Sequence, residues 1–501
     1  MEENQEIKKN KSKEFLKNNL PIILILCLGF AIRVYYFILT KNQAEWYDSG
    51  EYLSMASHWA FNLPYEFNSQ RPPLFPLMEA LFLKLGFGDN LLKFIVEVVP
   101  STLLILISYL IVKEMYNKKL ALLTSFFISI FWLILFNTVR LHADIPLLFF
   151  SYLAVYYFWK GYVKKERKYH LYLAFIFLAL AFLIKLTAGL FGIIFLIFLI
   201  LTDKLKFLKD KHLWISFVLF CLILLPYFIW QNNTFGSPTA FLFASHVTYD
   251  PGGITSYKPI GWYVLNWIPW MLHTPYFILF LIGLITLYTL FLSLDLILKN
   301  KSNEKYNDLL IFLWILLTLT YFIFLERDAE DRWLLPIALP LLILVSKGLY
   351  FVYDLIKKYQ KQVAVSVFII LILIGGYFQL ARASETINDK KDSYKEVRES
   401  SLWIKENSNP DDIIFSKSLT QVTYYAQRQV FGFGGNETEF KNDVKKYKPK
   451  YIVFSIFEPH GITLTYPEKF KDSLEPVKAY YAGDDNTKYV LVIYKFKNYD
   501  L

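Results

Sequence analysis

The stretch AEWYDSGEYLSMASHWA, residues 44–60, is acidic although it directly follows a long apolar run. It carries Glu45, Asp48 and Glu51 within seven residues, and Asp48 and Glu51 are spaced to share one face of a helix. A carboxylate in this position could act as a general base that removes a proton from a substrate. The pair also resembles a capping box with Asp in place of Ser or Thr, so a purely structural role stays open.

Other segments that border apolar runs carry a mixture of basic and acidic side chains. These residues are Arg71, Arg140, His142, Asp144, Lys185, Glu326, Arg327, Asp328 and Arg332. Guanidinium and ammonium groups can hold an anion such as a phosphate, and a carboxylate can take a proton from a hydroxyl group. If the fold gathers these segments on one side of a membrane, they suit a reaction on an anionic substrate better than the lining of a pore.

Several of these residues also have a structural interpretation. Asp144 precedes an Ile-Pro pair and could cap a helix, and Arg332 could anchor a helix end among lipid headgroups. His142 and Asp144 could bind a divalent metal with an acidic residue of the first segment, or they could form a simple hydrogen-bonded pair. Lys185 is harder to explain structurally, because an ammonium group within an apolar run normally needs a partner.

The elements that must position these residues are membrane helices. The 501 residues are 55% hydrophobic with a net charge of +10, and ordinary soluble chains are less apolar. The lysines cluster in short segments between apolar runs, which is typical of cytoplasmic loops and does not indicate nucleic-acid binding. Cys27 and Cys221 both lie in apolar runs, so neither a disulfide framework nor a cysteine metal site is expected.

Hydropathy and the basic loops predict about eleven spans. They are 20–40, 91–112, 119–137, 145–160, a hairpin of two short helices over 171–201, 213–231, 275–297, 309–325, 333–351 and 363–381. The run 171–201 is a hairpin in this scheme because basic loops flank both of its ends, and a single crossing cannot return to its starting side. The N-terminus is then cytoplasmic, and the charged segments face outward.

Two domains are expected. Residues 1–382 form the membrane domain, which includes an outer loop over 41–90. From about residue 383 the sequence becomes polar, and β-rich runs such as KYIVFSI and KYVLVIYKF alternate with helix-like segments. This pattern predicts a small extracytoplasmic α/β domain on a multi-pass protein of the plasma membrane.

An ordered set of motifs carries a family resemblance. DSGEYLSMA, RPPLFPLMEALF, RLHADIPLLFF, LAFLIKLTAGL and DRWLLPIALPLL resemble the GT-C membrane glycosyltransferases, and among them the family of protein O-mannosyltransferases and lipid A aminoarabinose transferases. The resemblance covers most of residues 20–350. It implies an all-α polytopic GT-C domain and transfer of one sugar from a polyprenyl (dolichyl) phosphate carrier to an acceptor hydroxyl, with inversion, on the outer face. Mannose or another hexose is the default sugar.

The resemblance also implies roles for the matching residues. Asp48 matches the acidic residue of the family's first outer helix and is the expected general base, with Glu51 and Asp144 as further catalytic candidates. The expected substrate contacts are Arg71, Arg140, His142, Lys185, Arg327 and Arg332. The expected partners are a polyprenyl-phosphate-linked donor, a protein, glycan or lipid acceptor, and the bilayer. No cofactor is certain, and a divalent metal ion stays open because some GT-C enzymes require one.

Two other function classes remain. A transporter or flippase for a lipid-linked or anionic solute would also use broken helices and charge within the membrane. Internal repeats would favour transport, and none is evident in the sequence. A membrane-anchored receptor would bind through the tail, in which we identify no metal, nucleotide or catalytic motif. The ordered motifs and the acidic outer helix favour the enzyme.

Overall fold

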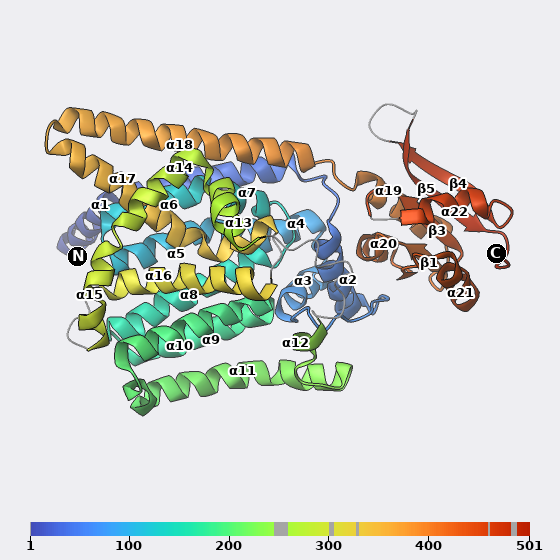
Figure 1. Cartoon of the computed structure of the whole chain (residues 1–501), viewed down its shortest axis with the longest axis horizontal. Helices are drawn as coiled ribbons and strands as arrows, with labels where there is room; N and C mark the ends of the chain where they lie inside the picture. The colour runs from blue at the N-terminus through green and yellow to red at the C-terminus, as the bar shows by residue number, and fades with distance from the viewer. Residues whose placement is uncertain (1, 245–258, 300–304, 327–329, 459–460, 482–487) are drawn as a thin grey trace.

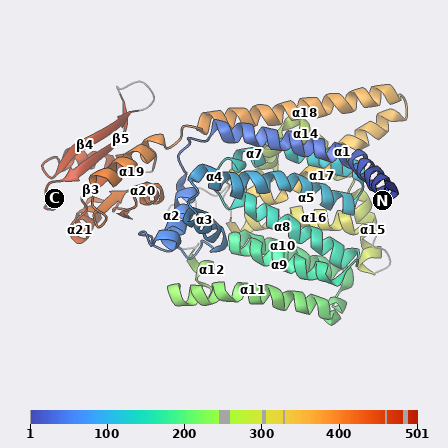
Figure 2. The same cartoon turned by 180° about the vertical axis from the view of Figure 1, so that it is seen from behind.

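The computed structural model describes residues 2–244, 259–299, 305–326, 330–458, 461–481 and 488–501. A long helical body occupies one side of the molecule, and a smaller domain with a β-sheet lies at one end of it (Figure 1). The N-terminus lies at the opposite end of the helical body, which the reverse view also shows (Figure 2). The predicted combination of a helical membrane domain and a small C-terminal α/β domain is confirmed.

The helices of the body follow the apolar runs of the sequence. They are α1 (Glu2–Leu39), α2 (Tyr47–Phe61), α3 (Leu74–Lys84), α4 (Asp89–Lys93), α5 (Val99–Met115), α6 (Lys118–Ile130), α7 (Trp132–Thr138), α8 (Asp144–Phe158), α9 (Lys168–Ile184), α10 (Gly189–Asp203), α11 (Lys211–Phe235), α12 (Ala240–Ala244), α13 (Ile260–Trp262), α14 (Ile268–Ile285), α15 (Tyr288–Leu298), α16 (Tyr306–Thr320), α17 (Ala338–Lys357) and α18 (Lys361–Lys390). Short 3-10 helices, Leu186–Ala188 and Asp331–Ile337, precede α10 and α17.

The described residues contain eight helices that are long and apolar enough to cross a membrane, or up to nine if a bent pair counts as one span. The predicted number of about eleven therefore stays a prediction. Three predicted boundaries differ from the structure. Helix α1 begins at Glu2 rather than at residue 20, because its Lys- and Glu-rich start favours a helix. The span predicted at 275–297 begins at Tyr263, and the one predicted at 363–381 continues to Lys390.

Besides the short interruption between α14 and α15, two helix breaks lie within the predicted spans and lead to the residues discussed below. Helices α6 and α7 meet at 51° across Phe131, whose extended backbone interrupts the single helix predicted over 119–137. Helix α9 ends at Ile184, and α10 begins at Gly189 after a short turn that contains Lys185. Helices α9 and α10 lie side by side in both views (Figures 1 and 2), as expected for the hairpin.

A buried arginine in α1 stabilises the break between α6 and α7. Arg33 is fully buried, and its Nη1 donates hydrogen bonds of 3.0 Å to the carbonyls of Gly29 and Ser129. Its Nε donates a 2.7 Å bond to Ser101 Oγ, which is 2.6 Å from Thr138 Oγ1 on α7. Carbonyls at a helix end lack partners within the helix and carry partial negative charge, so they suit a guanidinium group.

The C-terminal domain is a five-stranded mixed sheet in the order β2-β1-β3-β5-β4. Its strands and helices are α19 (Lys395–Asn407), β1 (Ile413–Ser416), α20 (Leu419–Ala426), β2 (Gln429–Phe431), α21 (Glu437–Tyr447), β3 (Tyr451–Ser455), α22 (Tyr466–Lys469), β4 (Leu474–Tyr481) and β5 (Tyr489–Phe496). Strand β1 runs parallel to β2 and β3, and β5 runs antiparallel to β3 and β4. Successive residues point to opposite faces. Ile414 therefore packs with α19 and α20, whereas Phe415 packs with α21.

Helix α20 attaches this domain to α2. Thr420 Oγ1 donates a 2.6 Å hydrogen bond to the carbonyl of Tyr47, and Tyr425 Oη accepts a 2.8 Å bond from the amide of Glu45. A Cβ atom on Gly50 would lie 3.0 Å from the backbone of Gln421, so the close approach of the two helices requires glycine at this position. The C-terminal domain thereby fixes the first turn of α2.

Replacement of Arg33 by Leu should lower the free energy of unfolding by about 2–4 kcal/mol, because buried carbonyl and hydroxyl groups lose their hydrogen-bond partners. Thermal unfolding of the purified protein in detergent measures this loss. Arg167→Leu removes an exposed arginine just before α9 and serves as the matched control. Equal melting temperatures for the two variants would contradict the role assigned to Arg33.

Candidate active site

Asp48 occupies the first turn of α2, at the end of the helical body next to the C-terminal domain (Figure 1). The N-cap of α2 is Trp46, and no side chain caps the helix. The Asp48 carboxylate instead contacts two arginines, one on each of its oxygens. Arg71 Nη2 lies 2.7 Å from Oδ1, and Arg332 Nη2 lies 2.5 Å from Oδ2.

Arg71 joins the two acidic residues of α2. Its Nη2 lies 2.6 Å from Glu51 Oε2, and its Nε donates a 2.7 Å hydrogen bond to the same oxygen. Asn68 Nδ2 donates to the other Glu51 oxygen at 2.8 Å. The guanidinium group also lies 5.0 Å from the centre of the Tyr52 ring. The helical spacing of Asp48 and Glu51 thus directs both carboxylates to one arginine.

Arg332 connects Asp48 to the segments around α8 and the α9–α10 break. Its Nη1 lies 3.8 Å from Asp144 Oδ2 and 3.3 Å from His142 Nδ1. On the far side of Asp144, Lys185 Nζ donates a 2.7 Å hydrogen bond to Oδ1. The extended backbone at Lys185 interrupts the helix and frees the side chain for this contact. Arg332 Nε also donates a 2.7 Å bond to Glu330 Oε2.

Most of the predicted site residues therefore belong to one network. It contains Asp48, Glu51, Asp144, Arg71, Lys185, Arg332 and His142, together with Glu330, which the sequence did not single out. Arg140 lies beside it, with its guanidinium group 3.5 Å from the ring centre of Trp46 and 3.7 Å from that of Phe136. Arg327 and Asp328 lie outside the described residues. Glu326 accepts a 3.3 Å hydrogen bond from Tyr321.

The charges around Asp48 control its protonation. Burial by itself raises the pKa of this carboxyl group, but the charges of Arg71 and Arg332 outweigh that effect and hold the pKa well below its ordinary value. Asp48 is consequently ionised throughout the physiological pH range. Arg71 and Arg332 belong to segments far apart in the sequence, so this environment exists only in the folded protein.

His142 is held neutral. Burial lowers the pKa of its imidazole well below the ordinary value, and the neighbouring charges of Arg332 and Arg140 lower it further. Because Arg332 donates toward Nδ1, the ring proton resides on Nε2, which has no hydrogen-bond partner among the described residues. His142 also lines the cavity described next.

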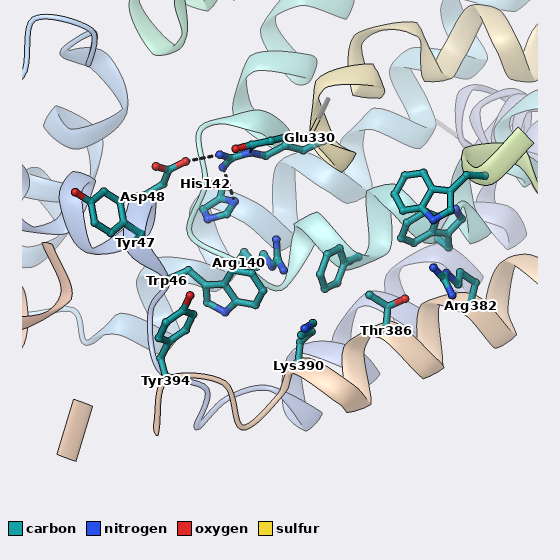
Figure 3. A pocket seen from close by; sticks show the side chains of 14 residues that line it. Trp46, Tyr47, Asp48, Arg140, His142, Glu330, Arg382, Thr386, Lys390 and Tyr394 are labelled. Carbon is teal, nitrogen blue, oxygen red and sulfur yellow. Dashed lines mark hydrogen bonds and ion pairs between the residues drawn. The ribbon is translucent and has the colours of Figure 1, made fainter. Parts of the chain in front are cut away.

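A cavity of about 450 Å³ opens beside Asp48 (Figure 3). Its walls contain Trp46, Tyr47, Asp48, Trp132, Phe136, Arg140, His142, Trp270, Glu330, Arg332, Arg382, Thr386, Lys390 and Tyr394. Figure 3 shows Thr386 and Lys390 on α18, on the other side of the cavity from Asp48 and His142. Arg71 and Lys185 do not line it. The polar positions of α18 are a signal that could have been found in the sequence, since they follow its apolar run at helical spacing.

The arrangement does not favour the metal interpretation of His142 and Asp144. No group of three or more His, Cys, Asp or Glu side chains is arranged to hold a metal ion in the part of the chain that the structure describes. The carboxylates of Asp48 and Asp144 contact basic side chains, and His142 Nδ1 accepts from Arg332.

The neutral state of His142 predicts a pH-dependent stability. An unfolded histidine binds a proton near pH 6.5, whereas the native imidazole does not, so unfolding takes up a proton below that pH. This residue should lower the free energy of unfolding by about 1.4 kcal/mol for each pH unit below roughly 6.5. Melting temperatures of the wild type and His142→Gln between pH 5 and 8 measure the effect. Parallel curves for the two proteins would contradict it.

Comparisons with known proteins relate this geometry to a family. Residues 70–230 match the model of the dolichyl-phosphate-mannose-protein mannosyltransferase family. A search of curated protein sequences finds no match. Among solved structures, the oligosaccharyltransferase of Archaeoglobus fulgidus is similar with a TM-score of 0.64 and 14% identity, over 95% of this chain and 74% of that one.

ArnT from Cupriavidus metallidurans, solved with undecaprenyl phosphate, is similar with a TM-score of 0.63 and 12% identity, over 95% of this chain and 98% of that one. The mycobacterial arabinofuranosyltransferase AftD is similar with a TM-score of 0.56 and 10% identity, over 94% of this chain and 41% of that one. At these identities the structures show a shared fold, and the family match adds the enzyme class. The protein is a membrane glycosyltransferase whose residues 70–230 resemble the dolichyl-phosphate-mannose-protein mannosyltransferases and whose fold is shared with these solved structures.

Proposed function

We propose that the protein transfers a single hexose from a polyprenyl-phosphate carrier to an acceptor hydroxyl, with inversion at the anomeric carbon. The observation that carries this proposal is the Asp48 carboxylate, which stands between two arginines at the wall of a cavity. The family match favours mannose as the sugar. The structure of ArnT with undecaprenyl phosphate, and that of the archaeal oligosaccharyltransferase with dolichol phosphate, support a lipid-phosphate donor.

The reaction takes place on the outer face in this proposal. Basic residues surround the N-terminus and the turn between α10 and α11, which lie at the end of the helical body away from the C-terminal domain (Figure 1). Cytoplasmic loops carry such basic residues, so the opposite end, with Asp48 and the C-terminal domain, faces outward. The predicted domain boundary near residue 383 falls within α18, and the C-terminal domain begins with α19 at Lys395.

Asp48 acts as the general base. Its carboxylate takes the proton of the acceptor hydroxyl as the acceptor oxygen forms a bond to the anomeric carbon of the donor. The bond from that carbon to the phosphate oxygen breaks, and its electron pair leaves with the polyprenyl phosphate. Arg71, Lys185 and Arg332 stabilise the charge that develops on this leaving group, because guanidinium and ammonium groups bind phosphate oxygens strongly.

The donor also regulates the base. Without donor, Arg71 and Arg332 are neutralised by Asp48 and its acidic neighbours, and the low pKa makes Asp48 a weak base. A bound phosphate competes for the same arginines, which raises the pKa of Asp48 toward its ordinary value. The base becomes effective when the donor is in place.

Replacement of Asp48 by Asn should lower the transfer rate by about 10²–10⁴-fold, since it removes the proton acceptor while nearly preserving shape. The assay is release of polyprenyl phosphate by the purified protein from a panel of polyprenyl-phosphate hexoses, with mannose first. Asp389→Asn, an exposed position on α18, is the matched control.

Full activity of Asp48→Asn would reject Asp48 as the base and direct attention to Glu51 and Asp144. Tight binding of a donor that is never cleaved, together with its movement across vesicle membranes, would favour the transporter or flippase instead.

A further inference from the structure

The half of the cavity farther from Asp48 is built by α18. Arg382, Thr386 and Lys390 all line it, and their spacing of four residues places them on one face of the helix. Figure 3 shows Thr386 and Lys390 on this helix, across the cavity from His142. None of the three belongs to the ion-pair network around Asp48, so the mechanism above does not use them.

The cavity wall carries more positive than negative charge. Its basic residues are Arg140, Arg332, Arg382 and Lys390, and its acidic residues are Asp48 and Glu330. Both acidic residues are ion-paired with Arg332. Arg382 forms an ion pair with Glu385, whose side chain is 61% exposed, and Lys390 forms no ion pair among the described residues. Solvent screens such a pair, so the positive charge of α18 is available to an anion.

The rest of this half is aromatic. The rings of Trp132 and Trp270 are perpendicular, with centres 4.7 Å apart, and the Arg382 guanidinium lies 5.6 Å from the Trp132 ring. The Trp132 indole nitrogen donates a 2.8 Å bond to the carbonyl of Met271, which fixes the ring. Rigid aromatic faces beside hydrogen-bonding groups fit a molecule that presents both apolar C–H faces and polar groups, such as a sugar ring.

Inversion at the anomeric carbon determines whether the donor or the acceptor occupies this cavity. The acceptor oxygen must approach the anomeric carbon from the side opposite to the phosphate. Arg71 and Lys185 lie outside the cavity and Asp48 lines it, while Arg332 lines it and also reaches Asp144, the ion-pair partner of Lys185. With the phosphate on the side of Arg71 and Lys185, the acceptor lies in the cavity, where its hydroxyl reaches Asp48. This step rests on the proposed function.

We propose that the cavity is the acceptor site and that the acceptor is an anionic saccharide, whose phosphate or carboxylate group is bound by Arg382 and Lys390. The tryptophans hold the sugar ring, and Asp48 receives the proton of its hydroxyl. Both basic residues can donate charge-assisted hydrogen bonds to an anion.

Binding is tested on the purified full chain in nanodiscs without donor, by tryptophan fluorescence. Glucose 6-phosphate and glucose are the probes, because they differ in one phosphate group. The phosphate probe should bind at least about tenfold more tightly than glucose, and less tightly as salt concentration rises. Arg382→Gln combined with Lys390→Gln should remove this preference. Lys391→Gln removes the neighbouring charge, which does not line the cavity, and should leave the preference intact.

Arg382→Lys and Lys390→Arg keep the charges and should keep the preference, which protects the test against a double variant that fails to fold. Equal affinities of the wild type for the two probes, or a folded double variant that binds the phosphate probe like the wild type, would overturn the proposal. Displacement of the probe by undecaprenyl phosphate would also overturn it, because the cavity would then be the donor side. Since no donor is used in the binding assay, its result is independent of whether polyprenyl-phosphate hexoses turn over.

Discussion

The shared coordination of one carboxylate by two arginines is the interaction on which the outer end of this molecule depends. Asp48, which is half-buried, stays ionised because Arg71 contacts one of its oxygens and Arg332 the other. Each arginine in turn needs further acidic partners, which Glu51, Glu330 and Asp144 supply. The network therefore requires the first outer helix, the α7–α8 connection, the α9–α10 break and the start of α17 to meet at one place.

That requirement explains features of the fold that would otherwise look unrelated. Helix α2 is held from the outside by α20, with Gly50 at the closest approach, and from below by a buried ion pair of 2.8 Å between Glu45 and Lys93. The bent α6–α7 pair is held by Arg33, which binds carbonyls that the break leaves without helical partners. Irregular backbone within a membrane is stable only where its polar groups have hydrogen-bond partners. Here the α6–α7 and α9–α10 breaks lie close in sequence to residues of the network.

The chemistry proposed for the site follows from its charge balance. In the absence of substrate, the arginines and Lys185 are neutralised by carboxylates, so the resting site is stable but its base is weak. In the proposed mechanism, an entering phosphate draws the basic groups away from Asp48 and strengthens the base at the same time. Arg382 and Lys390 of α18 do not contact the carboxylates of this network. We therefore propose that they bind a second anionic group, on the acceptor, rather than the donor phosphate.

The sequence by itself determined the class of the protein and the types of its reactive residues. Apolar runs, basic loops and the β-rich runs of the tail depend on neighbours within a few residues, and these patterns predicted a helical membrane domain followed by a small α/β domain. The same local logic singled out Asp48, Asp144, Lys185 and Arg332. Local sequence patterns did not predict the ion pair of Asp48 with Arg332, the contact of α20 with α2, or the position of Arg382 and Lys390 at the cavity. Only the tertiary structure decided those contacts, because they join segments distant in the chain through packing that no short stretch of sequence encodes.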